Sequence, residues 1–135
     1  MGMFDALSIS STGMSAERLR MDVIAENLAN AETTRTPQGG PYQRQEVVLE
    51  QAGPSFGQVL GGVRVAGIVS DASPPRRVYD PGHPDADKQG YVTLPNVNPV
   101  NEMVDLITAQ RGYEANVTAM SAAKQMFTKT LDVLR

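Results

Sequence analysis

An acidic loop at residues 79–90 holds the side chains best suited to chemistry. Four of its residues have the spacing of positions one, three, five and six in a calcium-binding EF-hand loop, namely Asp85, Asp87, Gln89 and Gly90. Position twelve of that motif needs a bidentate Glu, but Asn96 occupies it here, and no helices flank the loop as the motif requires. The pattern therefore favours a rigid turn, in which Asp side chains accept hydrogen bonds from nearby amides, over a calcium site.

The single histidine, His83, lies in the same loop, and the chain has no cysteine. A zinc site would need carboxylates for its other ligands, and disulfides and thiol nucleophiles are excluded. A metal-dependent hydrolase built on Asp80, His83, Asp85 and Asp87 would explain the acidic loop but not the rest of the chain. We therefore expect no catalytic residues, no cofactor, no bound metal and no small-molecule substrate.

Charge and hydropathy argue against further classes of function. The chain of 135 residues has a net charge of −3 and a pI near 5.1, and its Lys and Arg residues are scattered, so nucleic-acid binding is not expected. No stretch approaches the roughly 18 apolar residues that a transmembrane segment needs. Residues 1–15 lack the basic start, apolar run and cleavage site of a secretory signal, which taken alone predicts a cytoplasmic protein.

The strongest structural pattern runs from Asn98 to Arg135 and predicts one long helix. Asn98 is suited to cap it, and Pro99 suits the first helical position, where no amide hydrogen is needed. Apolar residues recur every seven positions in one row, made of Leu106, Tyr113, Met120, Phe127 and Leu134. A second row contains Met103, Val117 and Leu131. Two such rows predict a coiled-coil interface.

This apolar pattern continues almost to the end of the chain. At about 1.5 Å per residue the predicted helix would be about 57 Å long, which is more than one small domain of this chain can cover. We therefore expect the uncovered part of the helix to contact another chain.

A second helical segment is predicted from Met3 to about Ala31. Its seven-residue repeat consists of Leu7, Met14, Met21 and Leu28, and Ile24 widens the apolar stripe in the second half. The first half contains four serines and Gly13, which weaken a helix, so we expect it to be disordered until something packs on it.

The middle of the chain predicts short strands at 42–49, 62–69 and 91–94 after a polar turn. With nine Pro and twelve Gly in the chain, this part is expected to be a small, loop-rich β element that leans on the helices. The predicted fold is mainly α, with long N- and C-terminal helices that form a coiled coil and a small irregular β-rich middle segment. The corresponding division of the chain is 1–32, 33–96 and 97–135.

Short motifs at both ends resemble those of a known family. The residues STGMSA at 11–16, followed by NLAN at 27–30, resemble the N-terminal signature of bacterial flagellar rod and hook proteins, and QRGYEAN at 110–116 resembles their C-terminal one. Between them, the stretches 33–42, 78–86 and 90–98 are similar to the proximal-rod members of that family. Two residues depart from the pattern, Glu32 and Gly112, and the glycine allows close approach of a neighbour.

The resemblance implies a structural subunit of the flagellar basal-body rod, the shaft that transmits motor torque. It implies that the terminal helices pair into a coiled coil around the shaft axis, and that the partners are other proximal and distal rod proteins and copies of this chain. It also implies passage through the flagellar export apparatus, without a cleaved signal peptide, to the periplasmic rod. Independently, the apolar rows, the weak first helix and the small middle segment indicate a chain that orders on assembly.

An intracellular coiled-coil adaptor is the competing hypothesis. It would explain both seven-residue repeats, but such adaptors normally have richer charge pairing beside the apolar rows and no proline-rich β segment between the helices.

Overall fold

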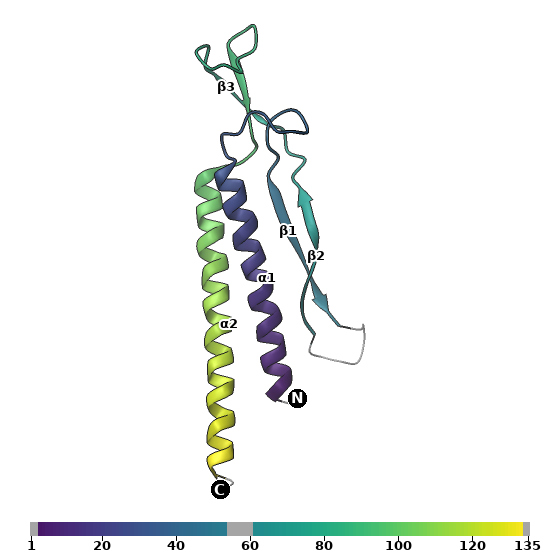
Figure 1. The fold of residues 1–135 in the computed structure, drawn as a ribbon, viewed down its shortest axis with the longest axis vertical. Helices are drawn as coiled ribbons and strands as arrows, with labels where there is room; N and C mark the ends of the chain where they lie inside the picture. The colour runs from purple at the N-terminus through teal and green to yellow at the C-terminus, as the bar shows by residue number, and fades with distance from the viewer. Residues whose placement is uncertain (1–2, 54–60, 134–135) are drawn as a thin grey trace.

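The computed structural model describes residues 3–53 and 61–133. In chain order its elements are helix α1 (Met3–Ala29), strands β1 (Gln45–Ala52), β2 (Gly62–Ser70), β3 (Arg76–Tyr79) and β4 (Tyr91–Leu94), and helix α2 (Pro99–Val133). Two long antiparallel helices lie side by side, with the β1–β2 hairpin along α1 and the β3–β4 pair beyond the end where α2 begins (Figure 1). The predicted arrangement of two terminal helices around a small β region is confirmed at this level.

Helix α2 begins as the sequence predicts. Pro99 is its first residue, and the side-chain oxygen of Asn98 accepts a hydrogen bond from the amide of Val100 at 3.0 Å. Its 35 described residues make it about 52 Å long at about 1.5 Å per residue. Within residues 3–53 and 61–133, neither helix is long and apolar enough to cross a membrane.

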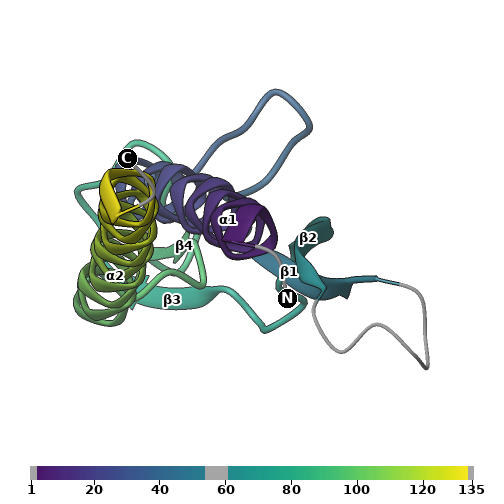
Figure 2. The ribbon, with the colours of Figure 1, turned by 90° about the horizontal axis from the view of Figure 1, so that it is seen from below.

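Helix α1 is continuous through its serine-rich first half. Ser15 and Thr12 donate side-chain hydrogen bonds to backbone carbonyls one turn earlier, which is the local competition that weakens isolated helices. Here α1 is the middle layer of the molecule, with α2 on one side and the hairpin on the other (Figure 2). Packing on two sides supports the helix, so the expected disorder of the free segment stays a prediction.

The hairpin of β1 and β2 is antiparallel, with Gln45 opposite Ser70 and Ala52 opposite Gly62. Val48 pairs with Gly67 but Leu49 pairs with Val65, so one extra residue lies in β2 and the register shifts there. Both predicted strands are present, with β1 starting later and extending further than expected. The side chains at positions 45, 47 and 49 are half-buried and alternate with exposed ones.

A second antiparallel pair joins β3 to β4, from Arg76 opposite Leu94 to Tyr79 opposite Tyr91. The predicted strand at 91–94 is confirmed, whereas β3 was not predicted. Its sequence, Arg-Arg-Val-Tyr, does not alternate between apolar and polar residues, so no pattern marks it as a strand. All four residues are exposed.

The core lies mostly around α1 because this helix contacts both other layers. Its buried residues are Ala16, Val23, Ile24 and Asn27, and Ala31 follows at its end. Helix α2 contributes Glu102, Ala109 and Ala123. These three buried residues of α2 are small or polar, and the two alanines allow the helices to approach closely.

Candidate functional site

The two helices pack in a fixed antiparallel register. A Cβ atom on Gly13 would lie 2.9 Å from the amide nitrogen of Asn116, and one on Gly112 would lie 3.2 Å from the carboxyl carbon of Glu17. Glu17 is four residues after Gly13, and Gly112 is four residues before Asn116, so the two contacts have the same alignment. Gly112 therefore allows close approach of a neighbour, as predicted, and the neighbour is the chain's own α1.

On the face of α2 turned to α1, four residues recur at intervals of seven positions, and the sequence analysis did not identify them. We call these four residues the inner row. Glu102, Ala109 and Ala123 of this row are buried, and half-buried Asn116 lies between the two alanines. The predicted residues Leu106, Tyr113 and Met120 are half-buried and fall three or four positions from this row, on the same face of the helix. The sequence does not reveal this row, because its residues are small or polar and helical periodicity is recognised from large apolar residues.

The second predicted row of α2 lies outside this contact. Its residues Met103, Val117 and Leu131 are exposed in the single chain, as is Phe127 of the first row, and Leu134 of the first row lies outside the described residues. Met103 and Val117 each follow a residue of the inner row by one position, which rotates them about 100° around the helix. Their role in contacts between subunits stays a prediction.

On α1, Leu7, Met14, Met21 and Leu28 are half-buried, while Ile24 is buried. The fully buried positions Ala16 and Val23 come two residues after Met14 and Met21, so the centre of the packed face differs from the predicted row.

An apolar surface remains on the side of α2 turned away from α1. We call Val100, Met103, Val104 and Ile107 the outer patch. Their exposed fractions are 68%, 55%, 58% and 51%, and spacings of three and four residues place them on one helical face. No described part of the chain covers them. Four adjacent large apolar side chains in solvent indicate an interaction surface.

A buried polar cluster joins the helices to the middle segment. Asn27 is 0% exposed, and its amide group donates to the backbone oxygen of Gln45 at 2.8 Å and to the carboxylate of Glu102 at 3.1 Å. Its side-chain oxygen accepts from the hydroxyl of Tyr42 and the backbone amide of Gln45. All the hydrogen-bonding capacity of Asn27 is therefore used to hold α1, α2 and the start of β1 together.

Arg44 supplies the positive charge of this cluster. Its side chain donates to Glu102, which is 1% exposed, and lies within 4 Å of carboxylate oxygens of Glu46, Asp71 and Asp105. The hydrogen bond to Glu102 is the largest cause that raises the pKa of Arg44. Burial, followed by the negative charges of Glu26 and Glu102, raises the pKa of the neighbouring Tyr42. We define the Asn27 cluster as Asn27, Tyr42, Arg44 and Glu102.

Sequence reasoning did not identify this cluster. Glu102 belongs to neither predicted apolar row, and Asn27 appeared only within the NLAN motif. An uncharged polar residue among the apolar positions of α1 was the available signal.

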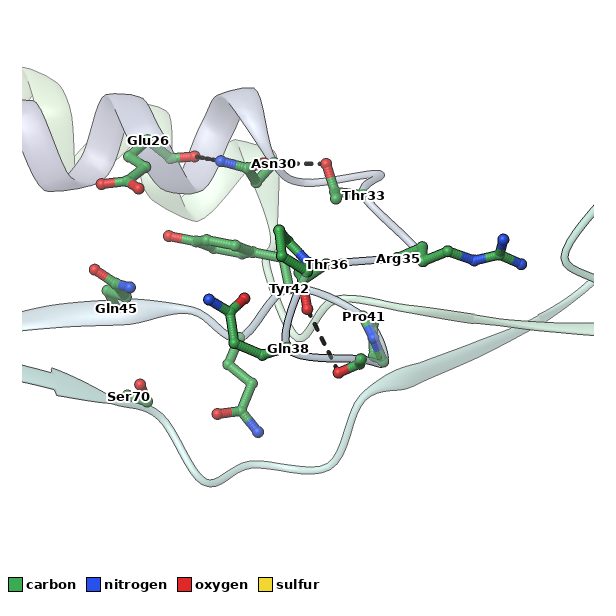
Figure 3. A pocket seen from close by; sticks show the side chains of 13 residues that line it. Glu26, Asn30, Thr33, Arg35, Thr36, Gln38, Pro41, Tyr42, Gln45 and Ser70 are labelled. Carbon is green, nitrogen blue, oxygen red and sulfur yellow. Dashed lines mark hydrogen bonds between the residues drawn. The ribbon is translucent and has the colours of Figure 1, made fainter.

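A shallow hollow of about 610 Å³ lies beside the cluster, between the end of α1, the turn at 33–42 and Ser70 (Figure 3). Its lining includes Glu26, Asn30, Thr33 and Arg35, and Asn30 and Thr33 bond to other lining atoms or to each other. Glu26 is the only carboxylate among the lining residues, so the hollow holds no pair of carboxylates.

The acidic loop forms the expected turns. Asp80 accepts from the amide of Gly82, and Asp87 accepts from the amides of Gln89 and Tyr91, which confirms the turn interpretation for both. His83 accepts from the amide of Asp85 through Nδ1. Among the described residues, no group of three or more His, Asp or Glu side chains is placed to hold a metal ion.

Asp85 instead ties the loop to the turn after α1. It accepts from the hydroxyl of Thr34 at 2.8 Å and pairs with Arg35, and the Thr34 bond is the largest cause that lowers the pKa of Asp85. A G-x-S-x-G sequence occurs at 53–57, and all of it after Gly53 lies outside the described residues. The arrangement offers contact surfaces and structural bonds.

Comparison with known proteins also indicates a structural protein. Residues 7–35 match the family described as flagella basal body rod protein, and residues 88–133 match the flagellar basal body rod FlgEFG protein C-terminal family. The chain is 48% identical to flagellar basal-body rod protein FlgC of Borreliella burgdorferi, over 100% of this chain and 99% of that protein. It is 45% identical to FlgC of Bacillus subtilis, with coverages of 96% and 97%, and 41% identical to FlgC of Salmonella typhimurium, with 97% of each.

Proposed function

The chain belongs to the FlgC family of flagellar basal-body rod proteins, and from this we propose how its two helices build the rod. The protein is a structural subunit of the proximal rod. In our proposal, α1 and α2 form a coiled coil that packs with other subunits around the axis of the shaft. The assembled subunits transmit torque from the motor, and no catalysis is involved.

The observation that carries this proposal is the uncovered apolar surface of α2. The outer patch has exposed fractions above one half at all four residues, on a helix about 52 Å long. A monomeric protein gains nothing from such a surface and risks aggregation through it. Covering it with neighbouring subunits turns this liability into a strong contact, because about 25 cal/mol is gained for each Å² of apolar area buried.

The spacing of inward residues supports a coiled coil. On α2 the inner face follows alternating steps of four and three residues through Glu102, Leu106, Ala109, Tyr113, Asn116, Met120 and Ala123. That is a seven-residue repeat with two positions on the contact. The polar contact of Asn27 with Glu102 within it fixes the register, because any shift would leave buried polar groups without partners.

We propose that Met103, Val117 and Leu131 of the second row meet neighbouring subunits. Phe127 and Leu134 of the first row, the latter beyond the described residues, do the same. These neighbours are other rod proteins and copies of this chain. The half-buried row of α1 would contribute at its edges. The division into 1–32, 33–96 and 97–135 follows as a proposal in which the Asn27 cluster attaches the middle segment to the coiled coil.

Two further parts of the proposal concern how the chain reaches the rod. It passes through the flagellar export apparatus without a cleaved signal peptide, and it resides in the periplasmic part of the basal body. The weak first half of α1 supports this route, because a chain that orders only on assembly can cross a narrow channel.

Purified basal bodies test the proposal. The unmodified chain should be present in them, and Val104→Asp should be produced and exported but absent from them. Ala72→Asp is the control, because Ala72 is exposed in the connection between β2 and β3 and lies outside the surfaces proposed to meet neighbours. Recovery of the unmodified chain in the cytoplasm and never in basal bodies would favour the adaptor hypothesis instead.

A further inference from the structure

Both outer layers of the molecule present apolar side chains to solvent. We define the hairpin outer face as Glu46, Val48 and Glu50 of β1 with their partners Val69, Gly67 and Arg64 of β2. Val48 and Val69 are 42% and 48% exposed. Because α1 lies between α2 and the hairpin (Figure 2), the outer patch and the hairpin outer face are on opposite sides of the molecule.

Contacts of α1 place these two surfaces at the same height along the long axis. At one end, Asn27 bonds both to Gln45 at the start of β1 and to Glu102 in α2. At the other end, the hydroxyl of Thr12 accepts from the amide of Val63 in β2 at 3.1 Å, and the adjacent Gly13 faces Asn116 of α2. The hairpin therefore spans the same height as residues 102–116 of α2.

Along this height the two surfaces show matching chemistry in the same order. From the Asn27 end, the hairpin presents Val69 and Val48 first and then the exposed ion pair of Arg64 with Glu50. Helix α2 presents the outer patch first and then, one turn further on, exposed Arg111 and Glu114. Neither of these two residues forms an ion pair within the described part of the chain.

We propose that the outer patch of one copy packs on the hairpin outer face of a second copy beside it. Met103 lies over Val69 and Ile107 lies over Val48, while Arg111 pairs with Glu50 and Glu114 with Arg64. Gly67 offers room at the centre, since nothing lies within 4 Å of its Cβ position. The contact covers the second face of a two-stranded sheet that has support on only one face in the single chain.

This contact rests on the proposed function and adds a geometry to it. The two surfaces differ, so the contact is heterologous, and each copy keeps one free surface of each kind. Such contacts extend in one direction and do not close in a symmetric pair. Side-by-side copies around a shaft would be joined in this way.

Disulfide cross-linking tests the contact, and the absence of native cysteine makes it specific. Val48→Cys and Ile107→Cys are introduced together into the full chain in rod-building cells, and purified basal bodies are oxidised and separated without reductant. Since α1 lies between the two sites, they cannot bond within one copy, because disulfide Cα atoms must lie within about 7 Å. We expect a ladder of two, three and more linked copies, and the same from Val69→Cys with Met103→Cys.

Matched variants separate this contact from nonspecific linking. Val48→Cys with Ser121→Cys should give no ladder, because exposed Ser121 lies beyond the height of the hairpin. Added to either cysteine pair, Arg111→Glu should remove the ladder, and adding Glu50→Arg should restore it, which a merely structural role of Arg111 would not predict. Dimers from Val48→Cys alone would show symmetric hairpin pairing and overturn the proposal.

The outcomes distinguish this inference from the proposed function. Basal bodies that contain either cysteine pair but show no ladder, or adducts only with a different protein, overturn the inference and leave the rod function intact. Absence of the unmodified chain from basal bodies overturns the proposed function. If neither pair assembles, Arg111→Glu without cysteines should reduce the amount in basal bodies at least tenfold and Glu50→Arg should recover it, and an unchanged amount overturns the inference.

Discussion

The two faces of α2 differ in the residues at their centres. The face packed against α1 centres on buried Ala109, Ala123 and Glu102, with half-buried Leu106, Tyr113 and Met120 beside them, whereas the face turned to solvent carries the outer patch. In a self-sufficient domain the large apolar residues would be inside. The small inner residues bring the helices close and fix their register, and the large outer residues are left for other chains. Fold and assembly thus depend on different faces of one helix.

The largest effect on the fold is expected from Arg44→Ala. Removing this guanidinium leaves the buried carboxylate of Glu102 with the amide of Asn27 as its remaining partner. Loss of one member of a buried ion pair costs about 3 to 5 kcal/mol, so the free energy of unfolding in urea should fall by that amount. Arg35→Ala is the control, because Arg35 is 79% exposed in its pair with Asp85 and should cost about 0 to 1 kcal/mol. Similar losses in both variants would contradict the importance of burial here.

The next prediction compares the two faces directly. Ile24→Ala removes a buried side chain and should lower the free energy of unfolding by about 2 to 5 kcal/mol. Val104→Ala removes an exposed one and should change it by less than about 0.5 kcal/mol while reducing the amount of protein in basal bodies. Urea titration measures the first quantity and immunoblotting of basal bodies the second. A large loss of stability from Val104→Ala would show that this residue is buried within the single chain.

These predictions depend on features that the sequence shows only in part. Both helices were predictable from their periodicity, and Asn98 and Pro99 marked the start of α2. The row that meets α1 was not predictable, because a long helix with several apolar rows does not reveal which row its own partner takes. Alanines such as Ala109 contribute little to periodicity, yet they determine how closely the helices approach. Glu102 needed partners from residues 27 and 44, which lie far away in sequence.

A smaller effect should follow from filling the close approach at Gly13. Leucine there would improve helix propensity, but its Cβ alone would lie 2.9 Å from the Asn116 amide nitrogen. Overpacking typically costs about 1 to 3 kcal/mol, so Gly13→Leu should lower the free energy of unfolding in urea by that amount. Ser11→Leu, at an exposed position of the same helix, serves as the matched control. Equal stability of both variants would mean that the helices are further apart than described.

The smallest effect concerns the contact of Asp85 with the turn after α1. The hydroxyl of Thr34 lowers the pKa of Asp85, so the contact stabilises the fold above the ordinary Asp pKa of about 3.9 and is lost as the pH falls through the lower folded value. Thr34→Val should raise the pKa of Asp85 in a carboxyl NMR titration. Asp87, whose pKa is lowered mainly by the amide of Tyr91, should not respond. An unchanged pKa of Asp85 would exclude this hydrogen bond.

The most direct test of the difference between the two faces is labelling of a cysteine in the outer patch. Val104→Cys is treated with a maleimide in the purified chain and in intact rods, and Gln89→Cys in the exposed acidic loop serves as the reference. We predict that Val104→Cys reacts readily in the free chain and at least tenfold more slowly, relative to the reference, in rods. Equal labelling of Val104→Cys in both states would contradict the claim that this face of α2 is covered on assembly.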